Sequence, residues 1–280
     1  MILEGNLQMK LEVYGCRGSV AISRSDSRYG GNSSCITLTK GDDFLVIDAG
    51  SGIMMLQDKL QNQRLKNTKF PINILLSHLH LDHIIGLGTF DPIWRKNKGV
   101  RIFTSSRDER PLDEQICDVF SPPYWPLPLK DFGKLDVVQI EPETPFEIGI
   151  FKITPFETGL HSDKTLSFYI TDGKKTLVYL LDSEMVDMDE IADAKLLKYC
   201  NGADIVVFDS SYSEKDYTMR KGWGHSTVKA GVELSKKWKC KHMLFTHFDQ
   251  KYNDDEIDNW QKVACGDKFI FAQDGLVIEI

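Results

Sequence analysis

The segment SHLHLDH at positions 77–83 follows directly on a short run, INILL, at positions 72–76, which is apolar except for Asn73. A largely apolar run of this length is typical of a strand buried on both faces. Side chains that come right after such a strand lie beyond its carboxyl end, where sheet-based sites usually form. Imidazole nitrogens and carboxylate oxygens suit zinc and similar divalent ions. The loop therefore predicts a metal centre, with the candidate ligands His78, His80, Asp82 and His83.

The number of these groups predicts two adjacent ions. Four candidate ligands fall within six positions, which is more than a single loop usually gives to one ion, because neighbouring side chains point apart. The bland alternative is a polar loop with solvated histidines. A cluster placed directly after a buried strand favours the metal centre.

The composition sets the class of protein. The chain has 280 residues, 41% of them hydrophobic, which is enough apolar material for a large core. Its net charge of −7 argues against a broad basic face, so we expect no extended nucleic acid as a partner. Apolar stretches fall short of the ~20 residues of a membrane span, and the N-terminus has no secretory signal. We therefore expect a cytoplasmic protein without a membrane partner.

The cysteines and the order of the predicted elements complete this outline. Six scattered cysteines include no C-x-x-C pair, which favours free thiols over a thiolate zinc site or disulfides. Strand patterns dominate both halves of the chain, and we expect one domain over 1–280 with an irregular Pro/aromatic-rich insertion around 91–145. Strands are predicted at 10–14, 35–39, 44–48, 72–76, 100–103, 151–155, 166–171, 176–181, 205–208, 243–246 and 276–280. Helices are predicted after the DAGSG segment, where Ile53, Leu56 and Leu60 share a face, and at 188–199 and 227–238.

The signature H-x-H-x-D-H after a strand resembles that of the metallo-β-lactamase superfamily of hydrolases. The resemblance extends along nearly the whole chain and includes the aspartate-glycine turn at Asp48-Ala49-Gly50. The segments GCRGS, GGNSSC and SPPYWPLPL are similar to a phosphodiesterase-like branch, which includes cyclic-nucleotide phosphodiesterases and transfer-RNA 3′-processing endonucleases. The resemblance, with ligands at strand ends in both halves, implies an α/β (α+β) fold, the four-layer αββα sandwich.

The resemblance also implies the complete set of metal ligands. His161 in TGLHSDK, Asp182 in LVYLLDSE and His247 in LFTHFD match the family's remaining ligands. One ion is then expected on His78, His80 and His161, and the other on Asp82, His83 and His247, with Asp182 between them. Zn²⁺ is the expected ion, with Mn²⁺ and Fe²⁺ as alternatives. Such a pair would supply a metal-bound hydroxide, and Asp82 is counted among the catalytic residues as well.

A general acid is needed for the leaving group, and His225 is the candidate. It lies in GHSTVKAGVELSKKW, where Ser226 or Thr227 can cap the following helix. This stretch is similar to the transfer-RNA endonucleases, in which a histidine of the same segment is paired with a carboxylate. Here the carboxylate would be Asp209 in VVFDSSY, and Phe208 stands where those enzymes have a histidine. The alternative is a surface histidine beside a helix.

The expected function is metal-dependent hydrolysis of a small anionic substrate, most simply a phosphodiester, with cyclic phosphates as the first candidates. Only 21 positions separate His161 from Asp182, which leaves no room for the RNA-binding arm of the transfer-RNA endonucleases. A hydrolase of the same fold acting on an acyl ester, thioester or lactone is the first alternative. The second is a non-catalytic metal-binding sensor. The sequence also allows an oligomer. Arg17 is open to two interpretations, a substrate contact or a surface ion pair.

Overall fold

The computed structural model describes residues 8–24, 26–61, 71–95, 99–132, 134–161 and 163–280. Within these ranges the strands form two seven-stranded sheets and one two-stranded ribbon. The first sheet has the order β16 (Val277–Glu279), β1 (Lys10–Gly15), β3 (Cys35–Lys40), β4 (Asp43–Ile47), β5 (Ile72–Leu75), β6 (Val100–Thr104) and β7 (Leu135–Gln139). The second has the order β15 (Phe269–Phe271), β13 (His242–Thr246), β12 (Ile205–Asp209), β11 (Thr176–Leu180), β10 (Leu166–Thr171), β9 (Phe151–Glu157) and β8 (Phe146–Ile148).

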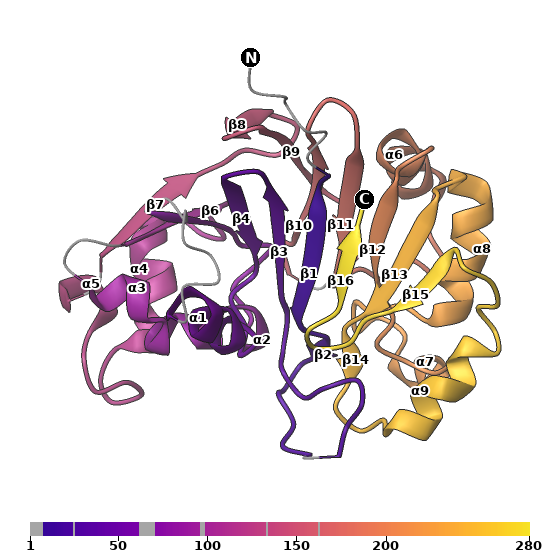
Figure 1. Cartoon of the computed structure of the whole chain (residues 1–280), viewed down its shortest axis with the longest axis horizontal. Helices are drawn as coiled ribbons and strands as arrows, with labels where there is room; N and C mark the ends of the chain where they lie inside the picture. Colours follow the sequence, from indigo (N-terminus) through magenta and orange to yellow (C-terminus); the bar gives the residue numbers. More distant parts are fainter. Residues whose placement is uncertain (1–7, 25, 62–70, 96–98, 133, 162) are drawn as a thin grey trace.

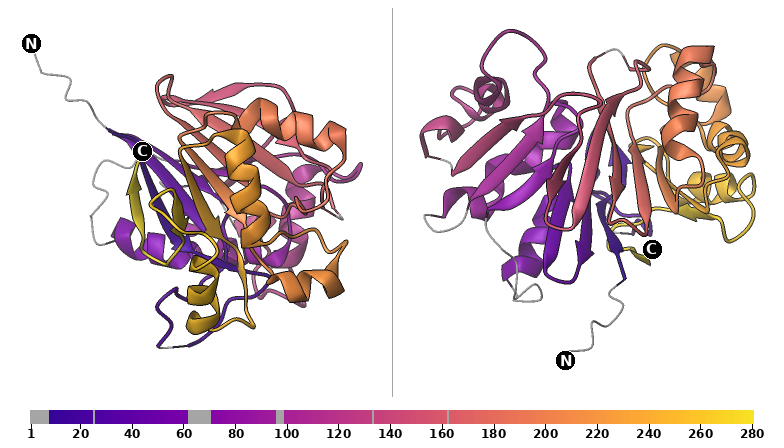
Figure 2. Two further views of the ribbon diagram at one scale, coloured as in Figure 1. Left: turned by 90° about the vertical axis from the view of Figure 1, so that its right-hand side faces the viewer. Right: turned by 90° about the horizontal axis from the view of Figure 1, so that it is seen from above.

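The two sheets pack face to face, and helices cover both outer faces (Figures 1 and 2). The first sheet is covered by α1 (Ile53–Gln61), α2 (Leu81–Ile84), η1 (Ile85–Thr89), α3 (Asp91–Trp94), α4 (Leu112–Cys117), η2 (Asp118–Phe120) and α5 (Leu129–Phe132). On the side of the second sheet lie α6 (Glu190–Cys200), α7 (Glu214–Arg220), α8 (Val228–Trp238) and α9 (Asp254–Gln261). The predicted four-layer αββα sandwich is thus confirmed.

Because side chains alternate between the two faces of a strand, one strand contributes to two apolar layers. In β4 the side chains of Leu45 and Ile47 belong to the apolar cluster between the sheets, whereas Val46 belongs to the cluster under the outer helices. Successive residues of a strand point to opposite faces, so a continuous apolar run is buried on both sides. In α1 the face predicted from the sequence packs inward, since Ile53 and Leu56 are fully buried.

Strand direction brings the ends of several strands together. The pairs β4–β5 and β5–β6 are parallel in the first sheet, and β11–β12 and β12–β13 are parallel in the second. The carboxyl ends of parallel neighbours lie at one edge of a sheet, and ligands usually bind at such an edge. The ribbon of β2 (Arg17–Gly18) and β14 (Phe248–Asp249) pairs an early segment with a late one beside these ends.

The segment 91–145 contains more regular structure than the sequence predicts. Besides β6, which covers the strand expected at 100–103, it forms β7, which lies at the edge of the first sheet, and the short helices α4 and α5. The aromatic Trp125 packs edge-on against Phe120 in the core of this region, while Tyr124 is exposed. None of the described helices is both long and apolar enough to cross a membrane.

Candidate metal centre

The histidine-rich loop lies where the sequence predicts it. β5 ends at Leu75, and the chain continues through His78 and His80 into α2, the short helix that carries Asp82 and His83. His78, Asp82 and His83 are buried, while the side chain of His80 is 44% exposed. The loop therefore presents four candidate ligands at the end of a buried strand, three of them shielded from solvent.

The other three candidate ligands come from the second sheet. His161 lies between β9 and β10, Asp182 follows β11, and His247 follows β13. Asp182 and His247 have positive φ angles of 49° and 66°. Residues other than glycine rarely adopt this backbone conformation, and those that do cluster at functional sites. These turns direct the two side chains toward the histidine-rich loop of the other sheet.

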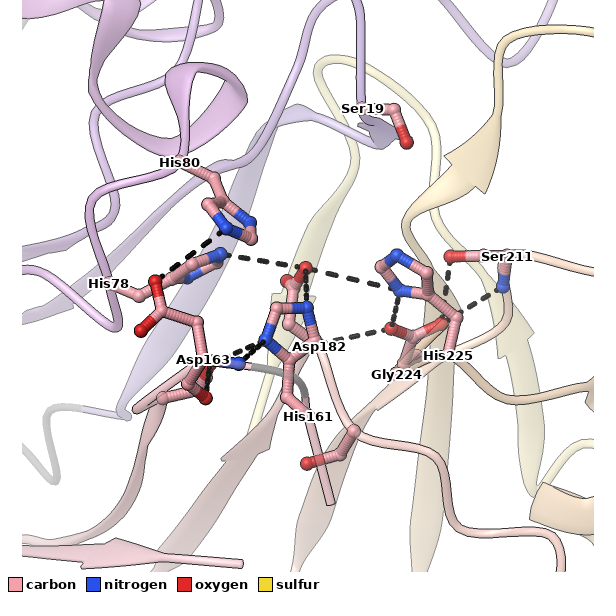
Figure 3. Close-up of polar contacts among 12 residues, drawn as sticks. Ser19, His78, His80, His161, Asp163, Asp182, Ser211, Gly224 and His225 are labelled. Carbon is pink, nitrogen blue, oxygen red and sulfur yellow. Dashed lines mark hydrogen bonds and ion pairs between the residues drawn. The ribbon is translucent and has the colours of Figure 1, made fainter. Parts of the chain in front are cut away.

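Asp182 lies at the centre of the cluster (Figure 3). Its Oδ1 is 3.6 Å from His78 Nε2 and 3.8 Å from His161 Nε2. Its Oδ2 is 3.0 Å from His83 Nε2 and 3.4 Å from His247 Nε2. The two oxygens of one carboxylate thus face two different sets of imidazoles, which is the arrangement expected of a ligand shared between two ions.

The remaining distances define the same two sets. The donor atoms of the first set all lie within 4.8 Å of one another, and this set is His78, His80, His161 and Asp182. The second set meets the same limit and is Asp82, His83 and His247. Within it, Asp82 Oδ2 is 3.3 Å from His247 Nε2 and 3.4 Å from His83 Nε2. A third group within the same limit is Asp182, His225 and His247. The sequence predicts one ion on His78, His80 and His161 and the other on Asp82, His83 and His247, with Asp182 between them.

Two buried atoms show that this donor set fits a cation. His78 Nε2 and Asp182 Oδ2 are buried and make no hydrogen bond with any described residue. Buried polar atoms are nearly always paired, so the unpaired nitrogen of the first set and the unpaired carboxylate oxygen that faces the second set each need another partner. Divalent ions with nitrogen and oxygen ligands satisfy such atoms. The fold and these clusters together imply divalent metal ions.

The electrostatics of the cluster keep several groups in the form that binds metal. Burial lowers the pKa of His78 well below its usual value, and nearby His83 acts in the same direction. Burial also lowers the pKa of His161, to about 4. The pKa of Asp182 lies well below its usual value because the neighbouring imidazoles outweigh its burial. Neutral imidazole and ionised carboxylate are the ligand forms.

Groups behind the ligands fix the orientation of His83 and His247. Asp48 Oδ2 lies 2.7 Å from His83 Nδ1 and also accepts from the Tyr179 hydroxyl at 2.6 Å. Ser211 Oγ is 3.0 Å from His247 Nδ1. Sequence reasoning placed Asp48 in a turn but gave it no role, and it missed Tyr179 and Ser211. The period-two alternation of the strands in the sequence does not indicate such contacts, because they depend on how the two sheets pack.

A backbone N–H group also fixes the orientation of the Asp82 carboxylate. The Ser19 N–H donates to Asp82 Oδ2 at 2.7 Å, from a residue with a positive φ of 63°. Ser19 follows the β2 ribbon, whose Gly18 lies against the His247 ring. The early GCRGS segment therefore reaches the metal centre through its backbone.

His225 and Asp209 form a buried pair beside Asp182. Asp209 Oδ2 is 2.8 Å from His225 Nδ1, and it also accepts the Asp182 N–H at 3.0 Å. Asp209 occupies Nδ1, so Nε2 is the nitrogen left for a ligand (Figure 3). Burial lowers the pKa of His225, but Asp209 outweighs it and raises the pKa to about 9. Thr227 caps α8 by accepting from the Ala230 N–H, as one of the two predicted caps.

One other residue is placed differently from both interpretations of the sequence. Arg17 is neither a substrate contact nor a surface ion pair, because its guanidinium is buried, where it lies 3.8 Å from Asp254. It is fully buried and donates to the carbonyl oxygens of Gly30 and Tyr252. Five of the six cysteines are buried and all are free thiols, whereas Cys265 is exposed.

Comparisons with known proteins agree with this geometry. The family described as Beta-lactamase superfamily domain matches residues 44–248. A Bacillus subtilis (strain 168) protein named "Probable metallo-hydrolase YhfI" is 25% identical over 274 residues, which cover 97% of this chain and 100% of that protein. A ribonuclease Z from Bradyrhizobium sp. (strain ORS 278) is 20% identical, over 81% of this chain and 87% of its own.

Solved structures share the fold. The crystal structure of YhfI from Bacillus subtilis superposes with a TM-score of 0.72 at 22% identity, covering 98% of this chain and 100% of that one. A structure described as a new diphosphatase from the PhnP family gives a TM-score of 0.70 at 18% identity, with 98% of each chain covered. The chain therefore belongs to the beta-lactamase superfamily, and it is a hydrolase.

Proposed function

We propose that this protein hydrolyses a small phosphodiester with two divalent ions, most simply Zn²⁺, in the site. The ions would be held by His78, His80 and His161 and by Asp82, His83 and His247, with Asp182 shared between them. When bound, they supply Lewis-acid polarisation of the phosphoryl oxygens and lower the pKa of the attacking water. The observation that carries the proposal is the His225–Asp209 pair, which lies next to the shared carboxylate.

The chain's own residues account for the protons. Hydrolysis forms a bond from a water oxygen to phosphorus and breaks the bond from phosphorus to the leaving oxygen. An alkoxide is a poor leaving group without a proton, so a positioned acid accelerates its departure. His225 holds such a proton on Nε2, because Asp209 orients the ring through Nδ1. Asp82, in the second set of ligands, is the carboxylate proposed to take up the proton that the water loses.

The names of relatives and the layout of the chain support this substrate class. Ribonuclease and diphosphatase, the names of two relatives, denote hydrolysis at phosphorus. A small substrate is favoured over a long RNA because β10 and β11 account for the described residues between His161 and Asp182, apart from short connections. A cytoplasmic location is part of the proposal, since free cysteines fit a reducing compartment.

The first test is the substitution His225→Ala, assayed on an alkyl phosphodiester and on its nitrophenyl counterpart. We expect unchanged metal content and a loss of about 10²–10⁴-fold on the alkyl ester, the usual contribution of a general acid. The loss on the nitrophenyl ester should be much smaller, because nitrophenolate leaves without a proton.

The control is a hydrolysis screen of the wild-type protein, loaded with zinc or manganese, on cyclic phosphates, linear phosphodiesters and acyl esters. Faster turnover of an acyl ester, with equal loss on both leaving groups in His225→Ala, would contradict the proposal and favour an acyl hydrolase. No turnover of any ester by metal-loaded protein would favour the sensor.

A further inference from the structure

The loop that carries His225 contains two glycines with positive φ angles, Gly222 at 89° and Gly224 at 85°. Glycine has wide conformational freedom, so such a loop does not hold a single conformation by itself. An acid that donates a proton must be fixed within a fraction of an ångström of its target. Something outside the loop must therefore hold it.

The side chain of Glu184 makes the contacts that hold this loop. The Gly222 N–H donates to both carboxylate oxygens, at 2.9 and 2.8 Å, and the Gly224 N–H donates to Oε2 at 3.1 Å. The Tyr217 hydroxyl of α7 donates to Oε1 at 2.9 Å. An ionised carboxylate is an acceptor only, and here three donors converge on it. Hydrogen bonds to a charged group are the stronger kind.

Glu184 itself is fixed by the strand end that carries Asp182. Its own N–H donates to the Leu160 carbonyl at 2.8 Å, next to His161. One residue earlier, the Ser183 carbonyl accepts from Ser226 Oγ at 2.6 Å. The segment after β11 and the segment before α8 are thus joined on both sides of His225.

The held loop also touches a candidate metal ligand. A side chain on Gly224 would place its Cβ 2.2 Å from the His161 ring, so the loop backbone lies directly against that imidazole. A cavity of about 310 Å³ adjoins this contact, and Glu184, Leu160 and Gly222 line it together with His161. Release of the loop would therefore change the surroundings of both His161 and His225.

We propose that Glu184 is a positioning residue, which acts through the loop 222–224 to hold His225 in place for proton donation. This rests on the proposed function for the role of His225. Glu184 contacts the loop and not the reacting atoms, so it is not itself a catalytic residue. The match of one acceptor-only carboxylate to three donors makes the amide of glutamine a poor substitute, because its NH₂ group would face a donor.

The test compares Glu184→Gln with Glu190→Gln, a matched change at an exposed glutamate of α6, and with Tyr217→Phe, which removes one donor only. Trypsin cleaves after Arg220 and Lys221, which directly precede Gly222. In Glu184→Gln, cleavage of the metal-loaded protein at these bonds should be roughly ten-fold faster or more, as expected when charged hydrogen bonds are lost. Tyr217→Phe should give a smaller increase, and Glu190→Gln none.

Activity and spectroscopy then connect the loop to His225. Turnover of the alkyl phosphodiester by Glu184→Gln should fall about ten-fold while the nitrophenyl ester changes little, because only the alkyl ester needs the acid. The NMR signal of the His225 ring proton bonded to Asp209, assigned by its loss in His225→Ala, should broaden or shift in Glu184→Gln alone.

Two outcomes would overturn the inference. One is wild-type trypsin cleavage with an unchanged His225 signal. The other is an equal loss on both esters together with a loss of metal, which would make Glu184 a support of Asp182 instead. If the wild-type protein cleaves no phosphodiester, the proposed function fails, and trypsin and NMR still decide whether Glu184 positions His225.

Discussion

At the scale of single residues, the metal centre depends on carboxylates that are not themselves ligands. Asp48 and His83 are both fully buried, and Asp48 also accepts from the Ser77 N–H at 2.8 Å. A carboxylate on the far nitrogen of a ligating histidine fixes its tautomer and its orientation. Burial alone would lower the pKa of His83, but Asp82, Asp182 and Asp48 raise it well above its usual value. The charge state of His83 therefore depends on these three carboxylates.

Asp48→Asn tests this dependence. We expect metal affinity to fall about 10–100-fold, which is the usual effect of losing such a partner. The amide of asparagine is uncharged, so it no longer offers His83 Nδ1–H a charged acceptor. Competition with a chelating dye measures the affinity, and circular dichroism confirms that the variant is folded. The matched control is Asp267→Asn, at an exposed aspartate before β15. Equal affinities in the two variants would show that Asp48 serves the fold and not the metal.

At the scale of elements, the sequence predicted best where strands are buried on both faces. The runs at β5, β11 and β12 are mostly apolar. β12 ends in Asp209, and β5 and β11 are followed within three residues by His78 and Asp182, so pattern and function coincide. The elements that were missed have weak patterns. β7 lies at an edge with no fully buried residue, and α9 buries only Ile257. Edge strands and solvated helices are fixed by tertiary contacts that no local period records.

In the site, too, some features could be predicted from the sequence and others could not. The candidate ligands could be placed at strand ends because they follow strong strand patterns at family-like spacing. The contacts of Ser19, Ser211 and Glu184 could not, because each joins segments that lie far apart in the chain. Hydrogen bonds such as that from the Ser19 N–H to Asp82 Oδ2, at 2.7 Å, arise only when the β2–β14 ribbon forms.

The ribbon leads to a prediction for Gly18→Ala. A Cβ at this position would lie 2.5 Å from His247 Nδ1, so the ring must move away. We expect the bound metal to fall from two equivalents toward one, measured by elemental analysis after dialysis, because His247 belongs to only one set. Gly173→Ala is the control, since its φ of 85° makes the substitution costly while nothing lies within 4 Å. It should lower stability by about 1 kcal/mol and leave metal content unchanged. If Gly18→Ala still binds two equivalents of metal, the β2–β14 ribbon has moved and the His247 ring has kept its place.

At the scale of the whole molecule, the candidate ligands come from both halves of the sandwich. His78, His80, Asp82 and His83 follow the first sheet, and the remaining three follow the second. An ion bound by residues from both sheets adds a link between them that the apolar core does not supply. Because a ligand that binds only the native state stabilises it by mass action, metal binding should strengthen both halves together.

This argument gives the last prediction, which concerns metal removal. Stripping the ions with a chelator should lower Tm, and restoring Zn²⁺ or Mn²⁺ in excess over Kd should raise the free energy of unfolding by about 3–4 kcal/mol at 100–1,000 Kd. Amide hydrogen exchange should slow at the strand ends of both sheets, near Ser77 and near Thr246, because neither half can open without breaking the shared site. Asp182→Asn should reduce both effects, since Asp182 faces both sets of imidazoles. If amide protection from exchange is confined to one sheet, or if the chain binds no more than one ion, a shared dinuclear centre is contradicted. The metal would then belong to a single half of the sandwich.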